Sequence, residues 1–424
     1  MICSSEYLIV KMVAIPALIL ACFAVVISPL AAQENRQETL KSDQDLVGWQ
    51  PAPSFESSGG EFSIKLRGRL HWDAAWIDDD DGLVDIHDTE FRTARMGIEG
   101  KAFIDFRFRL EFDFAGGEVS IKDGWILYDT GPVEIKFGQF KLAPSLEEAT
   151  SSQYTTFMER ASFTDAFGFA RQIGVSIKTS GKSWQFQMGA FRGAATDNGK
   201  DAGTMIAARA SMGPKVGDVQ LHFGAAVRFR DRDSDQSDFS YSQRPHQHLS
   251  ARFIDSGRIA DSDLFFGVEA AAIRGPISLQ GEWGWLEANL SDSFQASNPN
   301  LADPTFSGGY ISASYFLTGE SRPYSVSNGA FDRIRVKNPL HKGGLGAWEL
   351  GLRFDRIDLS DNGILGGEQD LFVVGLNWYP NRFMRVMLNY ARADIKRAFL
   401  VPILNGADGK NDVNSFGLRA QVNW

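Results

Sequence analysis

SFGLRAQVNW, residues 415–424, alternates strictly between apolar and polar or small side chains. One parity carries only apolar residues, namely Phe416, Leu418, Ala420, Val422 and Trp424. A period of two residues indicates a β-strand, because successive side chains point to opposite faces of a sheet. A soluble protein rarely places an aromatic residue at the end of so regular a strand. This stretch therefore predicts the last strand of a transmembrane β-barrel.

The same alternation is strongest in FRFRLEFDFA, residues 106–115. Phenylalanine and leucine occupy one parity, and charged residues occupy the other. A soluble sandwich would bury the apolar face, whereas a membrane barrel would turn it to lipid and the charges to a wet lumen. The pattern begins at Phe62 and continues to Trp424, which favours the barrel.

About sixteen strands can be placed in this part of the chain, within the range of bacterial barrels. They are expected at 62–76, 93–102, 106–115, 119–128, 132–140, 171–180, 183–193, 203–213, 217–229, 262–274, 276–290, 308–318, 346–358, 369–379, 382–397 and 412–424. Sixteen strands enclose an aqueous channel rather than a packed interior.

The connections between these strands alternate in length, as in barrels with short periplasmic turns and long external loops. Long connections are expected at 77–88, 141–170, 230–261, 291–306 and 398–411. Two connections break the rule, because 115–118 is short and 319–345 is long.

The N-terminal region predicts export. Residues 12–32 form an apolar run that follows Lys11 and ends in small residues, which is typical of a secretory signal peptide cut after Ala32. A retained helix and a lipoprotein cleavage before Cys22 are the alternatives. Both cysteines lie in this leader, so no disulfide is expected. The expected organisation is a signal peptide at 1–32, a polar arm at 33–60 and a barrel at 61–424, placed in the outer membrane of a Gram-negative bacterium.

Composition and motifs exclude several functions. The formal net charge of −10 argues against nucleic-acid binding. No nucleophile elbow, P-loop or zincin motif appears, so neither an enzyme nor a cofactor is expected. His246 and His248 lack an evident third metal ligand, and the acidic stretch 78–88 does not fit an EF-hand, so no metal site is expected.

Several stretches resemble the phosphate-selective porins O and P. They are LRGRLHWDAAW (66–76), FRTARMGIEGKAF (91–103), FRLEFDFA (108–115), KDGWILY (122–128), KFGQFKLAPSLEEATSSQYTTFMER (136–160), RQIGVSI (171–177), YFLTGE (315–320) and GAWELGLRFDRIDLSD (346–361). The resemblance implies a sixteen-stranded barrel, usually a homotrimer. It also implies that 141–170 is a constriction loop and that 319–345 folds into the lumen from the periplasmic side.

The resemblance also implies an anion site. Ser151, Ser152 and Arg160 match positions of the family's phosphate site, but Glu148 stands where the phosphate-specific branch has a lysine. Glu148 and its neighbour Glu147 are expected to repel phosphate. Glu159 and Arg160 are expected to pin the constriction loop.

The inward parity of the first strands carries a basic set that consists of Lys65, Arg67, Arg69, Arg95, Lys101, Arg107 and Arg109. It indicates either an anion path or a charge-balanced wall paired with nearby carboxylates. We therefore expect a porin that passes small hydrophilic solutes, in particular anions such as phosphate. The alternatives are a general or weakly cation-preferring porin and a plugged structural or receptor barrel. Expected partners are small anions, outer-membrane lipid and lipopolysaccharide, further copies in a homotrimer, and the barrel-assembly machinery, which reads a signal resembling the strand that ends in Trp424.

Overall fold

The computed structural model describes residues 46–48, 52–80, 82, 84–195, 203–233, 237–396 and 409–424. The signal peptide expected at 1–32 and most of the loop expected at 398–411 lie outside these residues. In the described part of the chain, no helix combines the length and apolarity of a membrane span.

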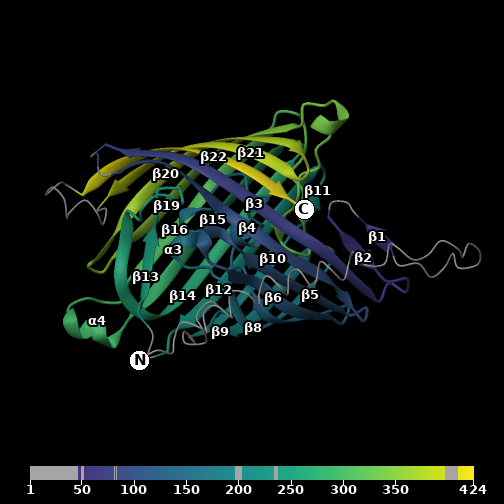
Figure 1. The fold of residues 1–424 in the computed structure, drawn as a ribbon. Coiled ribbons are helices and arrows are strands. Elements are labelled where there is room, and N and C mark those ends of the chain that lie inside the picture. Colours follow the sequence, from purple (N-terminus) through teal and green to yellow (C-terminus); the bar gives the residue numbers. More distant parts are fainter. Residues whose placement is uncertain are drawn as a thin grey trace, which may run out of the picture. The chain divides into compact units, whose positions relative to one another are not determined.

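Within the described residues, sixteen antiparallel strands form a closed barrel (Figure 1). They are β3 (Phe62–Asp79), β4 (Asp85–Ala102), β5 (Phe106–Asp113), β6 (Ser120–Asp129), β7 (Glu134–Phe140), β8 (Gln172–Ser180), β9 (Trp184–Arg192), β10 (Thr204–Met212), β12 (Val219–Asp231), β14 (Ile254–Arg274), β15 (Ile277–Leu290), β16 (Thr305–Phe316), β19 (Ala347–Asp361), β20 (Ile364–Asn381), β21 (Met384–Lys396) and β22 (Lys410–Asn423). The predicted fold class and strand number are confirmed.

The described residues also form shorter strands, short helices and 3₁₀ turns. They are β1 (Leu46–Gly48), β2 (Ser54–Glu56), β11 (Lys215–Val216), β13 (Phe239–Gln243), β17 (Tyr324–Ser325), β18 (Ala330–Phe331), α2 (Leu146–Ala149), α3 (Ser162–Ala166), α4 (Asp292–Ser297) and the 3₁₀ turns η1 (Ala115–Gly117) and η3 (Leu340–Lys342). Strands β1 and β2 pair with each other, and β2 pairs with β3. The arm expected at 33–60 thus contributes strands to the sheet.

The barrel closes where the last strand meets the first, so that yellow β22 lies beside purple β3 in Figure 1. Arg419 of β22 donates two hydrogen bonds to the Asp73 carboxylate of β3, at 2.7 and 2.6 Å. The backbones of Trp424 and Gly68 exchange hydrogen bonds at 3.2 and 3.0 Å. The indole of Trp424 covers Gly68, because a Cβ placed there would lie 2.1 Å from its Cζ2 atom.

The alternation that predicted the strands appears directly in the structure. On β5, Phe106 and Leu110 are exposed on the outer face, where lipid replaces water. Glu111, from the other parity, is buried inside against Arg67 and Arg95. The loop expected at 77–88 is shorter than predicted, because β3 extends to Asp79 and β4 begins at Asp85.

The constriction loop, residues 141–170, lies inside the barrel between β7 and β8. Its apolar side chains pack against the inner face of the wall formed by β14 to β21, where Phe163 lies 6.5 Å from Phe265 and 6.5 Å from Tyr310 between ring centroids. Phe157, Ala161 and Phe167 belong to the same buried cluster. The loop therefore fills the lumen on the side of β14 to β21.

We expect Gly68→Ala to destabilise the barrel by about 1–3 kcal/mol, the usual effect of overpacking. The added Cβ would displace the indole of Trp424 from the closing seam. The folded fraction can be followed by the heat-modifiable gel shift in increasing urea. Gly124→Ala is the matched control, because a Cβ there would lie at an ordinary 3.5 Å from Ile121. Equal stability of the two variants would contradict the role of this contact.

Candidate functional site

Two cavities lie in the lumen beside the constriction loop. One, of about 500 Å³, lies toward the long loops and is lined by residues of the 243–252 segment. The other, of about 760 Å³, lies toward the short turns and is lined by Arg382, Phe383 and Trp424. Five residues line both cavities, namely Arg95, Lys141, Glu148, Ser152 and Arg160. We call these five residues the junction, because they line both cavities.

Both cavities are electropositive. The described lining of the turn-side cavity contains thirteen lysine and arginine side chains and four side-chain carboxylates. The loop-side cavity is lined by seven lysine and arginine side chains and three carboxylates. The chain as a whole carries a formal net charge of −10. Positive charge is therefore concentrated in the lumen, where low-dielectric walls strengthen its field.

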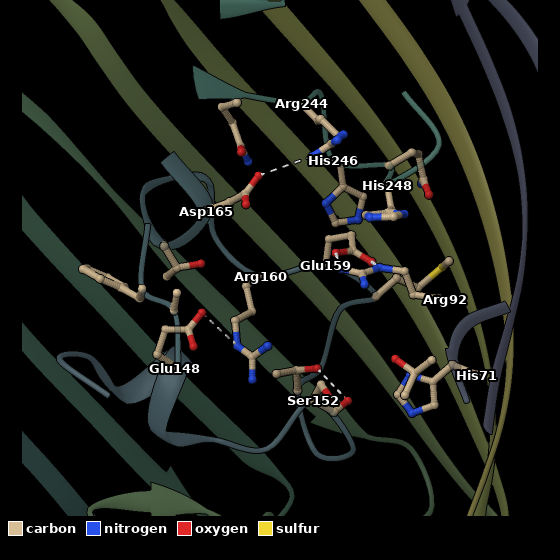
Figure 2. Close-up of a pocket in the computed structure, with 18 of the residues that line it drawn as sticks. His71, Arg92, Glu148, Ser152, Glu159, Arg160, Asp165, Arg244, His246 and His248 are labelled. Carbon is tan, nitrogen blue, oxygen red and sulfur yellow. Dashed lines mark hydrogen bonds and ion pairs between the residues drawn. The ribbon is translucent and has the colours of Figure 1, made fainter. Parts of the chain in front are cut away.

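Glu148 is held between two cations of the junction. One of its carboxylate oxygens accepts a hydrogen bond from Nζ of Lys141, and the other lies 3.5 Å from Nε of Arg160. Figure 2 shows Glu148 and Arg160 joined in this way. Burial by itself raises the pKa of the Glu148 carboxyl, but Arg160 and Lys141 lower it to a net value below the ordinary one. Glu148 is therefore ionised and paired, rather than facing the pore as a bare negative charge.

Lys141 is the titratable cation of the junction. Its burial lowers the pKa of its ammonium group to about 8, with Glu148 opposing this change and the positive charges of Arg160 and Arg171 adding to it. An ordinary lysine stays charged up to a pH near 10. Lys141 therefore loses its proton close to the physiological range.

Ser152 and Arg160 of the expected anion site belong to the junction, and Ser151 precedes Ser152 in the loop. Ser152 Oγ accepts a hydrogen bond from Arg69 Nη1 at 3.0 Å, and Ser151 lines the turn-side cavity. Arg160 also holds the loop itself, since it donates to the carbonyl oxygens of Glu147 and Thr150 at 3.0 and 2.7 Å. Part of its hydrogen-bonding capacity is thus committed to the loop backbone.

The expected pore-lining basic set is largely in the lumen. Six of its seven members line the turn-side cavity, namely Lys65, Arg67, Arg69, Arg95, Arg107 and Arg109. Lys101 is exposed and belongs to neither cavity lining. Carboxylates pair with most of this set, as Arg109 does with Glu99 at 2.7 Å. The lumen wall therefore combines a surplus of cations with local charge pairs.

Other arginines are structural. Arg353, Arg385 and Arg419 are almost completely buried in the wall. They donate hydrogen bonds to loop carbonyl oxygens: Arg353 to Glu159 at 3.1 Å, Arg385 to Thr155 at 2.5 Å and Arg419 to Met158 at 2.5 Å. Buried carbonyl groups need such partners in the absence of water. All three arginines hold the loop; Arg353 and Arg385 belong to neither cavity lining, whereas Arg419 also lines the loop-side cavity.

Glu159 also attaches the loop to the wall, but here the loop supplies a negative side chain and the wall supplies arginines. Its carboxylate accepts from Arg92 at 3.1 Å through two nitrogens and from Arg419 at 2.8 Å. Burial raises the pKa of this carboxyl, and the two arginines lower it by more, to well below its usual range. These contacts agree with the expectation that Glu159 and Arg160 hold the loop.

The histidines singled out in the sequence make other contacts. His246 is buried, with Nδ1 3.2 Å from Arg353 and Nε2 3.3 Å from Asn389, and burial together with Arg353 lowers its pKa to about 3. His248 lies 2.9 Å from the Glu90 carboxylate. Among the described residues, no group of three or more His, Cys, Asp or Glu side chains could hold a metal ion.

The segment between β16 and β19 reaches the constriction loop from the turn side. Arg322 is buried and donates to Gln280 of the wall at 2.5 Å, and its guanidinium lies over the ring of Phe331. The Phe331 amide in turn donates to Thr150 of the loop at 3.3 Å. The connection 319–345, which was expected to fold inward, therefore contacts the constriction loop on its turn side.

Several further cations that line the cavities were not predicted from the sequence. They are Arg92, Lys136, Lys141, Arg171, Lys178, Arg244, Arg252, Arg333 and Arg382. Lys136 and Lys178 have the same strand parity as inward-facing neighbours, so the alternation could have identified them. The residues in irregular segments have no periodic signal, and Lys141 is one of these.

Comparisons with known proteins agree with this architecture. A family model described as phosphate-selective porin O and P matches residues 64–424. A protein of uncharacterised function from Caulobacter vibrioides is 34% identical over 394 residues, which cover 89% of this chain and 77% of that protein. Porin O from Pseudomonas aeruginosa is 27% identical over 413 residues, which cover 85% of this chain and 88% of that protein.

Solved structures share the fold at low identity. An anion-selective porin from Comamonas acidovorans has a TM-score of 0.55 and 12% identity over 86% of this chain and all of that chain. OmpT from Vibrio cholerae, solved in a trimer form, has a TM-score of 0.53 and 12% identity over 86% of this chain and 99% of that chain. These likenesses concern the barrel fold.

We expect the chloride-to-potassium permeability ratio of the barrel to fall as the pH rises through about 8, because Lys141 then loses its charge. One unit charge acting over ~6 Å in water changes ion preference by about threefold. The chloride-to-potassium permeability ratio, measured from reversal potentials between pH 6 and pH 9, checks this. Lys141→Arg should keep its charge and flatten the profile. An unchanged pH profile in that variant would assign the effect to another group.

Proposed function

The chain belongs to the family of phosphate-selective porins O and P and is an outer-membrane porin, and we propose that its channel prefers small anions, inorganic phosphate among them. The observation that carries this proposal is the surplus of lysine and arginine in both cavity linings. Rings of basic side chains bias pores toward anions. This local surplus of positive side chains contrasts with the formal net charge of −10 of the whole chain.

The alternative of a weakly cation-preferring porin rested on Glu147 and Glu148. Glu147 lies against the wall, where its carboxylate is 3.2 Å from the Gln280 amide and 3.5 Å from Arg353. Glu148 is paired with Lys141 and Arg160. Because neither carboxylate presents an unpaired charge to the lumen, we favour the anion channel. The two cavities that meet at the junction argue against a plugged receptor barrel.

Recording of single channels in a planar bilayer under a KCl gradient tests the proposal. We expect the reversal potential to have the sign of anion selectivity. Phosphate added at fixed ionic strength should reduce the chloride current, because both anions use the same basic lining. A cation-selective or unselective channel would overturn the proposal.

We also propose that the porin assembles as a homotrimer through the part of the wall formed by β5 to β7. Strands β5 and β7 have eight and seven residues, fewer than the nine or ten of β6 and β8 to β10 and far fewer than the twenty-one of β14. At ~3.3 Å per residue and a tilt of ~40°, seven residues rise about 18 Å, which is less than the ~25 Å apolar band of such barrels. Irregular backbone at this depth needs protein rather than lipid around it. The trimer form of the Vibrio cholerae protein supports a second copy as that cover.

We expect Leu110→Gln, on the exposed outer face of β5, to weaken the trimer. A buried amide without a partner costs about 1–3 kcal/mol per protomer. The mass of the detergent-extracted complex, measured by light scattering, checks this. Leu352→Gln, on the exposed outer face of the long strand β19, is the control. A wild-type monomer, or equal dissociation of both variants, would contradict this interface.

A further inference from the structure

The junction contains an anion of its own. The Glu148 carboxylate contacts both the ammonium of Lys141 and the guanidinium of Arg160, and a permeating oxyanion would find the same two partners there. Figure 2 shows the Arg160 side of this arrangement. The loop holds Glu148 in place, because its amide donates to Ser145 Oγ at 3.1 Å and its side chain is nearly buried. The neighbouring Glu147 turns the other way, toward Gln280 and Tyr310 of the wall.

We propose that Lys141 and Arg160 form an oxyanion-binding site that is occupied by the chain's own Glu148, and that this resident carboxylate sets how weakly the channel binds phosphate. The inference rests on the proposed function, because it concerns anions in the same lumen. It assigns to Glu148 a role in specificity that differs from simple repulsion. A free anion binds here only when it displaces the carboxylate from one or both cations.

The surroundings of the site fit an oxyanion. Ser152 Oγ, which Arg69 already contacts at 3.0 Å, belongs to the same junction. Arg95 completes the junction and keeps its own carboxylate partner, Asp113, at 2.8 Å. Removing the Glu148 charge would thus leave two cations and a hydroxyl facing both cavities, with Arg95 still neutralised.

The consequence for transport is fast release. A pore must bind an ion strongly enough to admit it and weakly enough to let it leave. With Glu148 in place, an entering phosphate replaces an existing ion pair instead of satisfying two bare cations. Phosphate is therefore expected to block the wild-type channel only weakly and to leave it quickly.

The test compares phosphate block of the chloride current in wild type, Glu148→Gln and Glu134→Gln. Glutamine keeps the shape of the side chain but releases both cations, so phosphate should block Glu148→Gln roughly tenfold more tightly than wild type. Glu134 lines only the turn-side cavity, and its loss changes the lumen charge equally. Equal tightening in both variants would mean that total lumen charge matters, and would overturn the resident-anion site.

A second pair of variants tests the partner. Lys141→Gln in the Glu148→Gln background should cancel the gain in phosphate block, because one of the two cations is then missing. A gain that survives this change would also overturn the site. The wild-type reversal potential separates the two proposals: an anion-selective wild type with no tightening in Glu148→Gln contradicts the site alone, whereas an unselective wild type contradicts the proposed function.

Discussion

The apolar contact between the constriction loop and one half of the barrel wall determines where the pore lies. Phe163 and Phe157 pack against side chains of β14 to β21, and this cluster fills the lumen on that side. The open passage is left beside β3 to β8, whose inward residues are mainly charged. An open barrel of sixteen strands would be wide and unselective, so the path of solutes depends on this packing.

Arginine serves two purposes in this lumen, and burial separates them. Behind the loop, Arg353 and Arg385 donate to backbone carbonyl groups, and Arg419 does the same although it also lines the loop-side cavity. In front of the loop, Arg67 and Arg109 line the turn-side cavity, where both pair with Glu99. The planar guanidinium suits both settings, since it offers five donors and keeps its charge when buried. The number of arginines alone therefore overstates the positive field that a solute meets.

The barrel could be predicted from the sequence because strand periodicity is a local property. The parity of 106–115 correctly placed Phe106 outside and Glu111 inside. The junction was harder to predict, because only Arg95 lies on a strand, β4, and its other four members lie in an irregular loop without any period. Ser152 and Arg160 were expected from family resemblance, whereas Lys141, seven residues before Glu148, carried no signal. The expected repulsion by Glu148 left out the two cations that the loop brings to its carboxylate.

The seam between β22 and β3 also bears on how the chain folds. Asp73 and Arg419, which join across it, are 346 residues apart. Contacts between such distant residues form slowly, because most of the chain must be ordered before its ends can meet. Until that moment β3 and β22 each present an open edge that can pair with another chain. The unfolded protein therefore needs protection from pairing with other chains before it reaches the membrane. Its barrel can close only after the last strand, β22, is in place.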